Sequence, residues 1–306
     1  MSQILRGGVI GAGVFGGHHA RQYARLPGVV LSAVMDPHVE RAVALAVPLG
    51  GRAFVDLDAF LESVDVVTIA SPAAVHAEQA LAAIAAGKPV YVEKPIAVTV
   101  ADAEAIHAAG LAAGLVVACG HQERALFQAV GLFDIPEQPR RLEAVRHGLV
   151  SERNLDVSVV LDLMIHDLDL ALALSDAQPV SAEGEGTIHG KESWDVACAE
   201  VTFDDGFTAT FDVSRRAAQR RRTMKVIYPS GEVAIDFLAR TFRNTTAWPL
   251  NPDFADTPAA KDTLAVALES FLAAVRGEAP APLVGALDAA RALDVALGVE
   301  QALERG

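Results

Sequence analysis

The sequence predicts an α/β fold, in which a doubly wound parallel sheet is followed by an α+β half with a largely antiparallel sheet. Short apolar runs alternate with Ala-rich stretches of helical spacing over the first 120 residues, and a glycine-rich turn follows the first run. After about residue 121, hairpin signals replace this alternation. Strand–helix alternation is typical of parallel sheets covered on both faces, whereas consecutive hairpins indicate antiparallel pairing.

The N-terminal strands are expected at short runs rich in β-branched residues. They are Gly8–Gly11, Val29–Met35, Val64–Ala70, Val90–Val92 and Leu115–Cys119. Helices are expected between them, at Gly16–Leu26, Val39–Leu49, Asp56–Glu62, Ala74–Ala86 and Val100–Ala113. Because crossovers between parallel strands are right-handed, this order favours a doubly wound domain over residues 1–120.

The remaining residues, 121–306, are expected to form the α+β domain. Its strands are predicted at Leu142–His147, Val180–Ile188, Val196–Phe203, Phe207–Val213, Thr223–Tyr228 and Val233–Phe237. Its helices are predicted at Val157–Leu174, Ala259–Arg276 and Leu287–Glu304. The hairpin signals are Asp204-Asp205-Gly206 and Ser230-Gly231. Alternation places Ala197, Ala199, Val201 and Phe203 on one face, which predicts a sheet with one buried face.

Composition narrows the class of protein. With 306 residues and 52% hydrophobic residues, the chain is long enough for two globular domains. A net charge of -14 argues against nucleic acid as a partner, because the field of the protein would repel a polyanion. No basic start with an apolar segment and no run of about 18 apolar residues is present, so neither a signal peptide nor a membrane span is expected. Two cysteines outside any metal-binding spacing predict a cytoplasmic protein with no metal site.

A dinucleotide-binding motif lies between the first strand and the first helix. It reads G-x-G-x-x-G and comprises Gly11, Ala12, Gly13, Val14, Phe15 and Gly16. The first glycine permits a tight turn, the second lets a pyrophosphate approach the backbone, and the third allows close packing of helix and strand. The positive end of the helix then faces the phosphates. The alternative is a glycine-rich turn of an α/β fold that binds no nucleotide.

Asp36 supports the prediction of a nucleotide-binding site and indicates which cofactor it binds. It follows the second apolar run, twenty residues after Gly16, where an acidic side chain accepts hydrogen bonds from the adenosine ribose. Because this carboxylate would repel a 2′-phosphate, the motif predicts NAD in preference to NADP. Arg41 is the counter-argument, since its guanidinium could reach a 2′-phosphate. Together these features predict a Rossmann domain that binds NAD.

Two further clusters are candidates for catalysis. Glu93-Lys94-Pro95 follows the strand Val90–Val92, so Lys94 emerges at the sheet edge where ligands bind in such folds. Asp162 and His166 stand four residues apart in an apolar predicted helix and share a face. Burial of ionisable groups there is costly without partners, which points to function. A solvated lysine and a structural histidine satisfied within the core are the alternatives.

The glycine motif with His19, the Glu93-Lys94-Pro95 sequence and Asp162-x-x-x-His166-Asp167 together resemble the Gfo/Idh/MocA family of oxidoreductases, across nearly the whole chain. The resemblance implies catalytic roles for Lys94, Asp162 and His166. His166 would remove a hydroxyl proton, Lys94 would stabilise the developing charge on the same oxygen, and Asp162 would orient the imidazole or bind a neighbouring hydroxyl.

The resemblance also implies further ligand contacts. For the cofactor these are Ser71, Pro72, His76, Glu93 and Lys94, with a structural role equally open for His76. The family's C-terminal domain binds substrate and commonly forms a homodimer or homotetramer through its sheet. The sequence alone does not separate such an enzyme from a sensor or scaffold that binds NAD without turnover, although the catalytic trio argues against the latter.

Three stretches resemble one branch of the family, the UDP-N-acetylglucosamine 3-dehydrogenases and similar nucleotide-sugar oxidases. They are Gly120–Arg124, Val160–Asp167 and Ser214–Arg222. A diphosphate in the substrate would give Arg124 and some of Arg215–Arg222 a purpose, since guanidinium groups bind phosphate oxygens. A charged strand edge that discourages aggregation is the alternative for the arginine stretch. Free sugars, inositol and other polyols are the alternative substrates.

Overall fold

The computed structural model of the chain describes residues 4–150, 157–175, 177–189 and 193–305. They form two compact units: one comprises the residues up to Gln122 together with Asp262–Ala290, and the other comprises Glu123–Lys261 and the residues from Arg291 onward. The chain first passes from one unit to the other after Gln122, close to the expected domain boundary at residue 120. The segment Asp262–Ala290 was expected in the C-terminal half, and it packs with the N-terminal unit instead.

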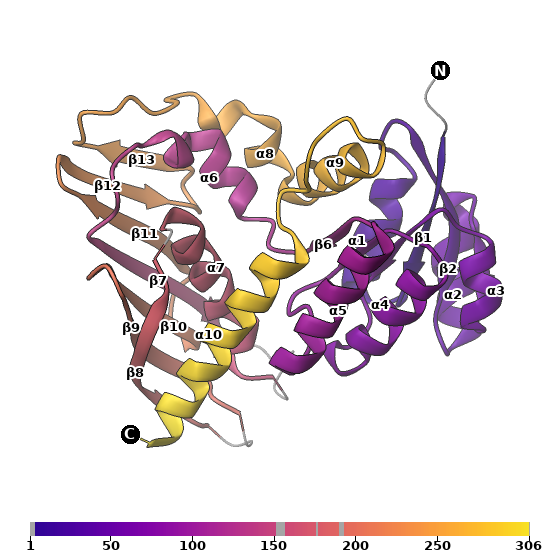
Figure 1. The fold of residues 1–306 in the computed structure, drawn as a ribbon, viewed down its shortest axis with the longest axis horizontal. Coiled ribbons are helices and arrows are strands. Elements are labelled where there is room, and N and C mark those ends of the chain that lie inside the picture. The colour runs from indigo at the N-terminus through magenta and orange to yellow at the C-terminus, as the bar shows by residue number, and fades with distance from the viewer. Residues whose placement is uncertain (1–3, 151–156, 176, 190–192, 306) are drawn as a thin grey trace. The chain divides into compact units, whose positions relative to one another are not determined.

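The first unit contains a six-stranded parallel sheet, of which β1, β2 and β6 are labelled in Figure 1. The order of its strands is β3-β2-β1-β4-β5-β6. Its strands are β1 (Leu5–Ile10), β2 (Val29–Met35), β3 (Arg52–Phe54), β4 (Val66–Ile69), β5 (Val90–Val92) and β6 (Val117–Cys119). Its helices are α1 (Val14–Tyr23), α2 (Val39–Ala46), α3 (Leu57–Glu62), α4 (His76–Ala85), α5 (Val100–Ala113) and α9 (Thr263–Val275), with 3₁₀ turns η1 (Val47–Leu49) and η2 (Ala73–Val75). The doubly wound fold is confirmed, and the strand order reverses between β1 and β4. Only the short edge strand β3 was absent from the prediction.

Apolar packing explains why α9 joins the first unit. Leu268 and Phe271 of α9 are completely buried in one core cluster with Val9 of β1 and Tyr23 of α1. Local sequence sets the start of this helix, because the Asp262 side chain caps it by accepting a hydrogen bond from the backbone N–H of Ala265. The segment therefore belongs to this unit through its core contacts.

The second unit is built on a seven-stranded sheet in the order β13-β12-β11-β7-β10-β9-β8. Its strands are β7 (Arg141–Leu149), β8 (Pro179–Thr187), β9 (Val196–Phe203), β10 (Thr208–Ala217), β11 (Arg221–Tyr228), β12 (Gly231–Asp236) and β13 (Thr241–Asn244). All neighbours are antiparallel except β7 and β10, which confirms a largely antiparallel sheet. Both hairpin predictions are confirmed: Gly206 has a φ of +86° between β9 and β10, and β12 begins at Gly231.

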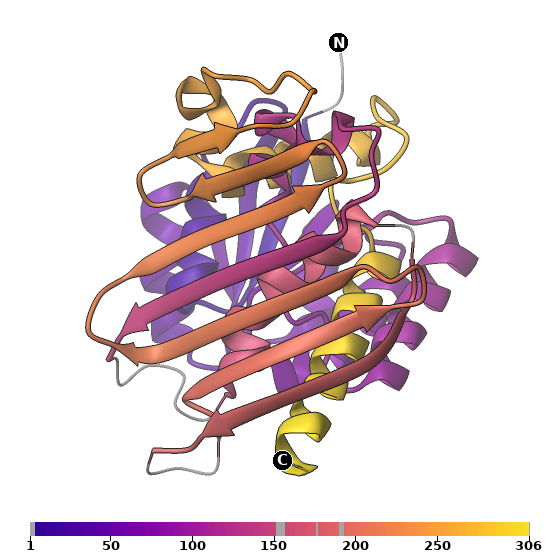
Figure 2. The same ribbon diagram turned by 90° about the vertical axis from the view of Figure 1, so that its left-hand side faces the viewer.

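One face of this sheet is buried beneath helices. The helical elements of the unit are α6 (Arg124–Val130), η3 (Leu132–Asp134), η4 (Val160–Met164), α7 (Ile165–Leu174), η5 (Phe254–Asp256) and α8 (Pro258–Lys261), and α10 (Ala286–Arg305) enters it at Arg291. The predicted face of β9 packs in a core cluster with residues of η4, α7 and α10. Figure 2 shows the other face toward the viewer, with no helix drawn in front of it.

The expected helix Val157–Leu174 has two parts. Residues Val160–Met164 form a π-helical turn, and the α-helix begins only at Ile165. A π turn is wider than an α turn, is rare, and frequently occurs at functional sites. Asp162 and His166 therefore lie on either side of a change in helical geometry, and the simple four-residue spacing of a regular α-helix does not apply to them.

None of the helices in the described parts of the chain combines the length and apolar character needed to cross a bilayer. Among the residues that the structure describes, no group of three or more His, Cys, Asp or Glu side chains is arranged to hold a metal ion.

Candidate active site

The glycine turn lies at the carboxyl end of β1, where α1 begins. Gly11 has a φ of +98°, which favours glycine, and Gly13 is the N-cap residue of α1. A Cβ on Gly16 would lie 1.8 Å from the carbonyl oxygen of Gly11, so helix and strand approach too closely for any side chain. A Cβ on Gly13 would meet no atom within 4 Å. The open space at Gly13, in front of a helix N-terminus, fits a pyrophosphate.

Asp36 directly follows the carboxyl end of β2, next to the glycine turn. Its two carboxylate oxygens accept hydrogen bonds from the backbone N–H groups of Ala12 and His38, both at 2.9 Å. The carboxylate thereby ties the glycine turn to the start of the next loop. Each carboxylate oxygen has more than one lone pair, so the side chain retains acceptor capacity for ribose hydroxyls. The positions of Asp36 and the glycine turn fit the adenosine half of NAD.

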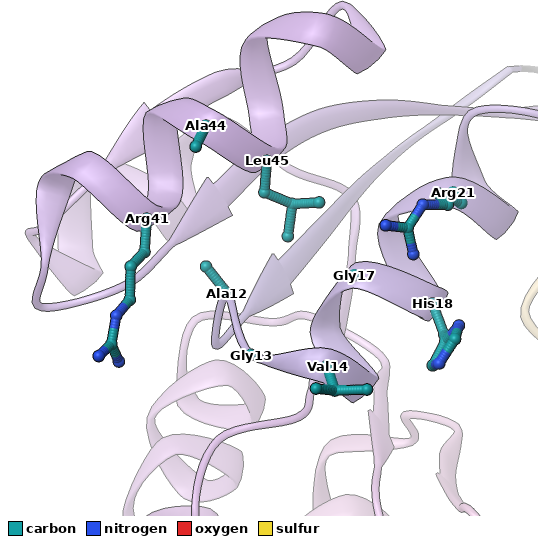
Figure 3. Close-up of a pocket in the computed structure, with 9 residues that line it drawn as sticks. All are labelled: Ala12, Gly13, Val14, Gly17, His18, Arg21, Arg41, Ala44 and Leu45. Atoms are coloured by element: carbon teal, nitrogen blue, oxygen red, sulfur yellow. The ribbon is translucent and has the colours of Figure 1, made fainter.

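A cavity of ≈480 Å³ lies against the glycine turn (Figure 3). It is lined by Ala12, Gly13, Val14, Gly17, His18, Arg21, Arg41, Ala44 and Leu45. Figure 3 shows Arg41 on α2 and Arg21 on α1 on either side of the turn. The lining contains no carboxylate, although the whole chain carries a charge of -14. This local excess of positive charge suits a nucleotide phosphate.

His76 connects two other loops at the same edge of the sheet. Its Nδ1 lies 2.8 Å from the carbonyl oxygen of Pro95, and its Nε2 lies 2.9 Å from that of Ser71. The side chain is buried, so these contacts hold the loops after β4 and β5 together. The resemblance implied that His76, Ser71 and Pro72 contact the cofactor. The geometry adds the structural role that was left open for His76.

Glu93 faces the interior of the first unit, whereas Lys94 is half-buried. The Glu93 carboxylate lies 2.7 Å from Nε2 of His19 and accepts hydrogen bonds from the backbone N–H of Lys94 and from Gln122, at 3.3 and 3.4 Å. Burial by itself would raise the pKa of Glu93, but His19 and Lys94 outweigh it and hold this pKa below its ordinary value. Glu93 therefore anchors the turn that carries Lys94.

The second unit carries Asp162 and His166, both half-buried. The Nδ1 atom of His166 lies 2.8 Å from Oε2 of Glu123, and the two groups form an ion pair when the imidazole is protonated. The resemblance implied that Asp162 orients the imidazole or binds a neighbouring hydroxyl, and Glu123 was not among the predicted site residues. The available signal was an acidic residue in the Gly120–Arg124 stretch, but nothing local relates that stretch to a helix forty residues further along.

Arg146 fixes the carboxylate of Glu123. From β7 it donates Nη1 to Glu123 at 2.8 Å, and it donates Nε and Nη2 to Asp167 at 2.8 and 2.7 Å. Burial favours the neutral form of Glu123, yet the charges of Arg146 and His166 outweigh it and hold the pKa of Glu123 well below its ordinary value. Asp167, suggested by its position as a functional candidate, is the buried partner of Arg146.

The arginines expected to meet a diphosphate fall into two groups. Arg124 is buried and donates to both carboxylate oxygens of Asp169, at 2.8 and 2.7 Å, and Arg215 is buried against Asp195. These guanidinium groups hold structure, so their geometry gives no support for a role in substrate binding. Arg222 is different: its side chain is 47% exposed, and its Nη1 lies 3.6 Å from Glu123. Within Arg215–Arg222, it is Arg222 that lies beside Glu123, the residue in contact with His166.

Comparison with known proteins places this geometry in a family. The N-terminal residues 5–121 match the model of the oxidoreductase family with an NAD-binding Rossmann fold, and residues 137–234 match the GFO/IDH/MocA C-terminal domain. The UDP-N-acetylglucosamine 3-dehydrogenase of Acidithiobacillus ferrooxidans is 34% identical over 316 residues, which cover 98% of this chain and 99% of the relative. Its solved structure matches with a TM-score of 0.88 over 100% of this chain and 99% of the other.

Two further proteins match less of the chain or share only the fold. The inositol 2-dehydrogenase of Pseudomonas syringae pv. syringae is 35% identical over 58% of this chain and 57% of its own length. The WlbA dehydrogenase from Bordetella pertussis, solved with NADH and UDP-GlcNAcA, has a TM-score of 0.86 at 18% identity, covering 100% and 97% of the two chains. The chain therefore belongs to the Gfo/Idh/MocA family of NAD-dependent oxidoreductases.

Proposed function

We propose that the protein oxidises a secondary hydroxyl of a nucleotide sugar with NAD, at the 3-position of a UDP-N-acetylglucosamine-like substrate. The observation that carries the proposal is the full-length similarity to an enzyme of that name. Arg222 adds support, because a half-exposed guanidinium beside the His166–Glu123 pair suits an anionic substrate. A free sugar, inositol or another polyol is the second candidate, favoured by the partial similarity to inositol 2-dehydrogenases.

The cofactor is assigned to the carboxyl edge of the six-stranded sheet. Gly11, Gly13, Val14, Phe15 and Gly16 would hold the pyrophosphate, with Asp36 on the adenosine ribose. Ser71, Pro72, His76, Glu93 and Lys94 would shape the nicotinamide end. When bound, NAD supplies the acceptor for the hydride. The chain itself binds and orients the cofactor and keeps these loops in place.

The proton chemistry is assigned to three side chains. His166 takes the proton of the substrate hydroxyl, since an imidazole can accept and return a proton near neutral pH. Lys94 donates a hydrogen bond to the same oxygen and stabilises the negative charge that develops there. Asp162 binds a neighbouring hydroxyl, because Glu123 already occupies the position beside Nδ1 of His166. Arg124 was expected to bind substrate, but the proposal now relies on Arg222.

The assembly and location follow the same reasoning. The sheet face of the second unit that no described helix covers is proposed to form a homodimer or homotetramer interface. We place the enzyme in the cytoplasm, where thiols stay reduced, because no disulfide joins Cys119 and Cys198. Size-exclusion chromatography with light scattering tests the assembly, and a monomer at micromolar concentration would contradict it.

The substrate proposal is tested by NADH absorbance at 340 nm. The purified protein is offered NAD with UDP-N-acetylglucosamine, N-acetylglucosamine or myo-inositol. Turnover with the nucleotide sugar at a kcat/KM well above the other two supports the proposal. Preferential turnover of inositol would favour the polyol dehydrogenase. NAD binding without turnover of any substrate would favour a sensor or scaffold.

A further inference from the structure

We infer that Glu123 is a positioning residue for His166: it selects the imidazole tautomer and stabilises the protonated ring. This inference rests on the proposed role of His166 as the proton acceptor. It adds a residue outside the Lys94, Asp162 and His166 trio. The observation behind it is the 2.8 Å separation of Glu123 Oε2 and His166 Nδ1.

Glu123 is itself held in place. Arg146 donates Nη1 to its other oxygen, Oε1, at 2.8 Å, and the side chain of Arg146 is only 3% exposed. The remaining donors of Arg146 are fixed by Asp167 through two hydrogen bonds. A carboxylate with one oxygen on a buried guanidinium and the other on an imidazole has little rotational freedom. The Arg146–Asp167 pair therefore fixes Glu123, and Glu123 in turn constrains the ring.

A second pair holds the backbone on which Glu123 stands. Glu123 is the N-cap residue of α6, and the next residue, Arg124, makes two hydrogen bonds to Asp169 of α7. Adjacent residues of α6 thus contact His166 and Asp169, which lie three positions apart on α7. Relative movement of α6 and α7 would stretch the Glu123–His166 contact and the Arg124–Asp169 pair together. The separation of Glu123 and His166 is consequently set by two elements that are joined by buried charges.

Carboxylates outnumber guanidinium groups around His166. The charged groups of this cluster come from α6, β7, β11 and α7, with Asp162 in the adjoining η4 turn. They are Glu123, Arg124, Arg146, Arg222, Asp167 and Asp169. With Asp162, four carboxylates meet three guanidinium groups, so one negative charge is in excess when the imidazole is neutral. A proton gained by His166 offsets this excess, and the nearby Glu123 Oε2 lies 2.8 Å from Nδ1 of the ring.

The consequence for catalysis follows from imidazole chemistry. In a neutral imidazole one nitrogen carries the proton and the other accepts. A carboxylate at Nδ1 favours the tautomer with the proton on Nδ1, so Nε2 is the accepting nitrogen. When Nε2 takes the substrate proton, the ring becomes cationic beside Glu123, as in other carboxylate–histidine pairs that support a proton acceptor. Glu123 itself stays ionised and touches neither substrate nor cofactor in this role.

The test compares Glu123→Gln, Glu123→Asp and His166→Ala with the unmodified enzyme, using the substrate that gives turnover. Glu278→Gln is the matched control, since it removes a carboxylate that is also paired with an arginine, Arg276, far along the chain. We expect Glu123→Gln to lower kcat on the order of 100-fold, with KM and NAD affinity within about twofold of the unmodified enzyme. Glu123→Asp should recover part of kcat, and Glu278→Gln should leave it unchanged.

The pH profile separates positioning from a merely structural role. Loss of the carboxylate charge makes protonation of the ring less favourable, so the acidic limb of kcat/KM should move to lower pH in Glu123→Gln. A loss of activity without movement of this limb would overturn the inference. Should Glu123→Gln fail to fold, ¹⁵N NMR of histidine in the unmodified protein decides, because neutral His166 protonated on Nε2 would contradict it.

The two failures are distinguishable. If His166→Ala keeps near-normal turnover, His166 is not the proton acceptor and the proposed mechanism fails. If His166→Ala is inactive while Glu123→Gln matches the unmodified enzyme in kcat and pH profile, the mechanism stands and the role of Glu123 is overturned.

Discussion

Nε2 of His19, on the helix that begins at the glycine turn, lies 2.7 Å from Oε1 of Glu93, beside the candidate catalytic Lys94. Both side chains are buried. The contact joins the nucleotide-binding helix α1 to the turn after β5. This buried polar pair therefore links two segments that are more than seventy residues apart in the sequence.

Replacement of His19 by alanine should destabilise the first unit. It leaves the Glu93 carboxylate buried without its closest partner, and an unsatisfied buried group costs about 1–3 kcal/mol, or more when charged. Chemical denaturation followed by circular dichroism measures the free energy of unfolding. His18→Ala is the control, since His18 is the exposed neighbour on the same helix. Equal stability of the two variants would mean that the His19–Glu93 contact contributes nothing.

Alanine at two glycines of the motif should affect different properties, NAD affinity in one case and stability in the other. Gly13→Ala places a methyl group in open space, so the protein should fold normally, whereas NAD should bind at least tenfold more weakly because the methyl group blocks the pyrophosphate. Gly16→Ala places a methyl group against the Gly11 carbonyl and should lower the melting temperature, because helix and strand must separate.

Calorimetry of NAD binding and thermal unfolding distinguish the two effects. A Gly13→Ala protein that binds NAD normally would contradict the placement of the pyrophosphate. A Gly16→Ala protein with an unchanged melting temperature would contradict the close approach of α1 and β1.

The secondary-structure elements that were predicted correctly are those with a clear local pattern in the sequence. Alternating apolar runs identified β1, β2, β4, β5 and β6, because parallel buried strands are continuous apolar segments. The prediction missed β3, whose three residues Arg52–Phe54 are too short to show a period. It also missed the π turn at Val160–Met164, since that geometry is a property of tertiary packing rather than of helical spacing.

The candidate site divides in the same way. The glycine turn and Asp36 were predictable because motif and ligand-binding chemistry lie within one βαβ unit. The contact of Glu123 with His166 and the pairing of Arg124 with Asp169 were not predictable, because each joins residues more than forty positions apart in the sequence. A side chain's charge can be read from the sequence, but whether that charge meets a ligand or a buried carboxylate is decided by the fold. Arg124 and Arg222 carry the same group, yet Arg124 is buried against Asp169, whereas the Arg222 side chain is 47% exposed beside Glu123.

Stability should fall as the pH is lowered below about 5. The pKa values of Glu93 and Glu123 are held below their ordinary value of 4.5 in the folded protein. The unfolded chain therefore binds more protons in this range, and the stabilisation present above pH 4.5 is lost as the pH falls toward the folded-state values. Urea unfolding at pH 7, 5 and 4 measures this loss.

The Glu123→Gln protein provides the comparison for this acid effect. It lacks one of the two carboxylates, so its free energy of unfolding should depend less steeply on pH between 5 and 4 than that of the unmodified protein. Identical slopes for the two proteins would show that Glu123 has no depressed pKa in the folded state.

Replacement of Arg222 by glutamine should affect nucleotide-sugar substrates selectively. The guanidinium is half-exposed beside Glu123, and under the proposed function its loss removes a charge-assisted contact to the diphosphate of the substrate. We expect KM for UDP-N-acetylglucosamine to rise roughly 10- to 100-fold, because one such contact contributes about 1.5–3 kcal/mol. Turnover of any uncharged sugar should change little. Arg220→Gln is the control, and an equal effect of both replacements would indicate a general effect of net charge.

The cofactor preference should depend on Asp36. In Asp36→Ala the repulsion of a 2′-phosphate disappears, while Arg41 on the cavity wall remains available to pair with it. The same change removes the acceptor for the backbone N–H of Ala12, so the glycine turn loses a contact that holds it for either cofactor. We therefore expect NAD affinity to fall by an order of magnitude or more and NADP affinity to fall less or to rise, which narrows the preference for NAD. Fluorescence titration with NADH and NADPH measures both affinities, with Asp58→Ala on the exposed side of α3 as control. Equal affinity of the unmodified protein for the two cofactors would mean that Arg41 already outweighs Asp36.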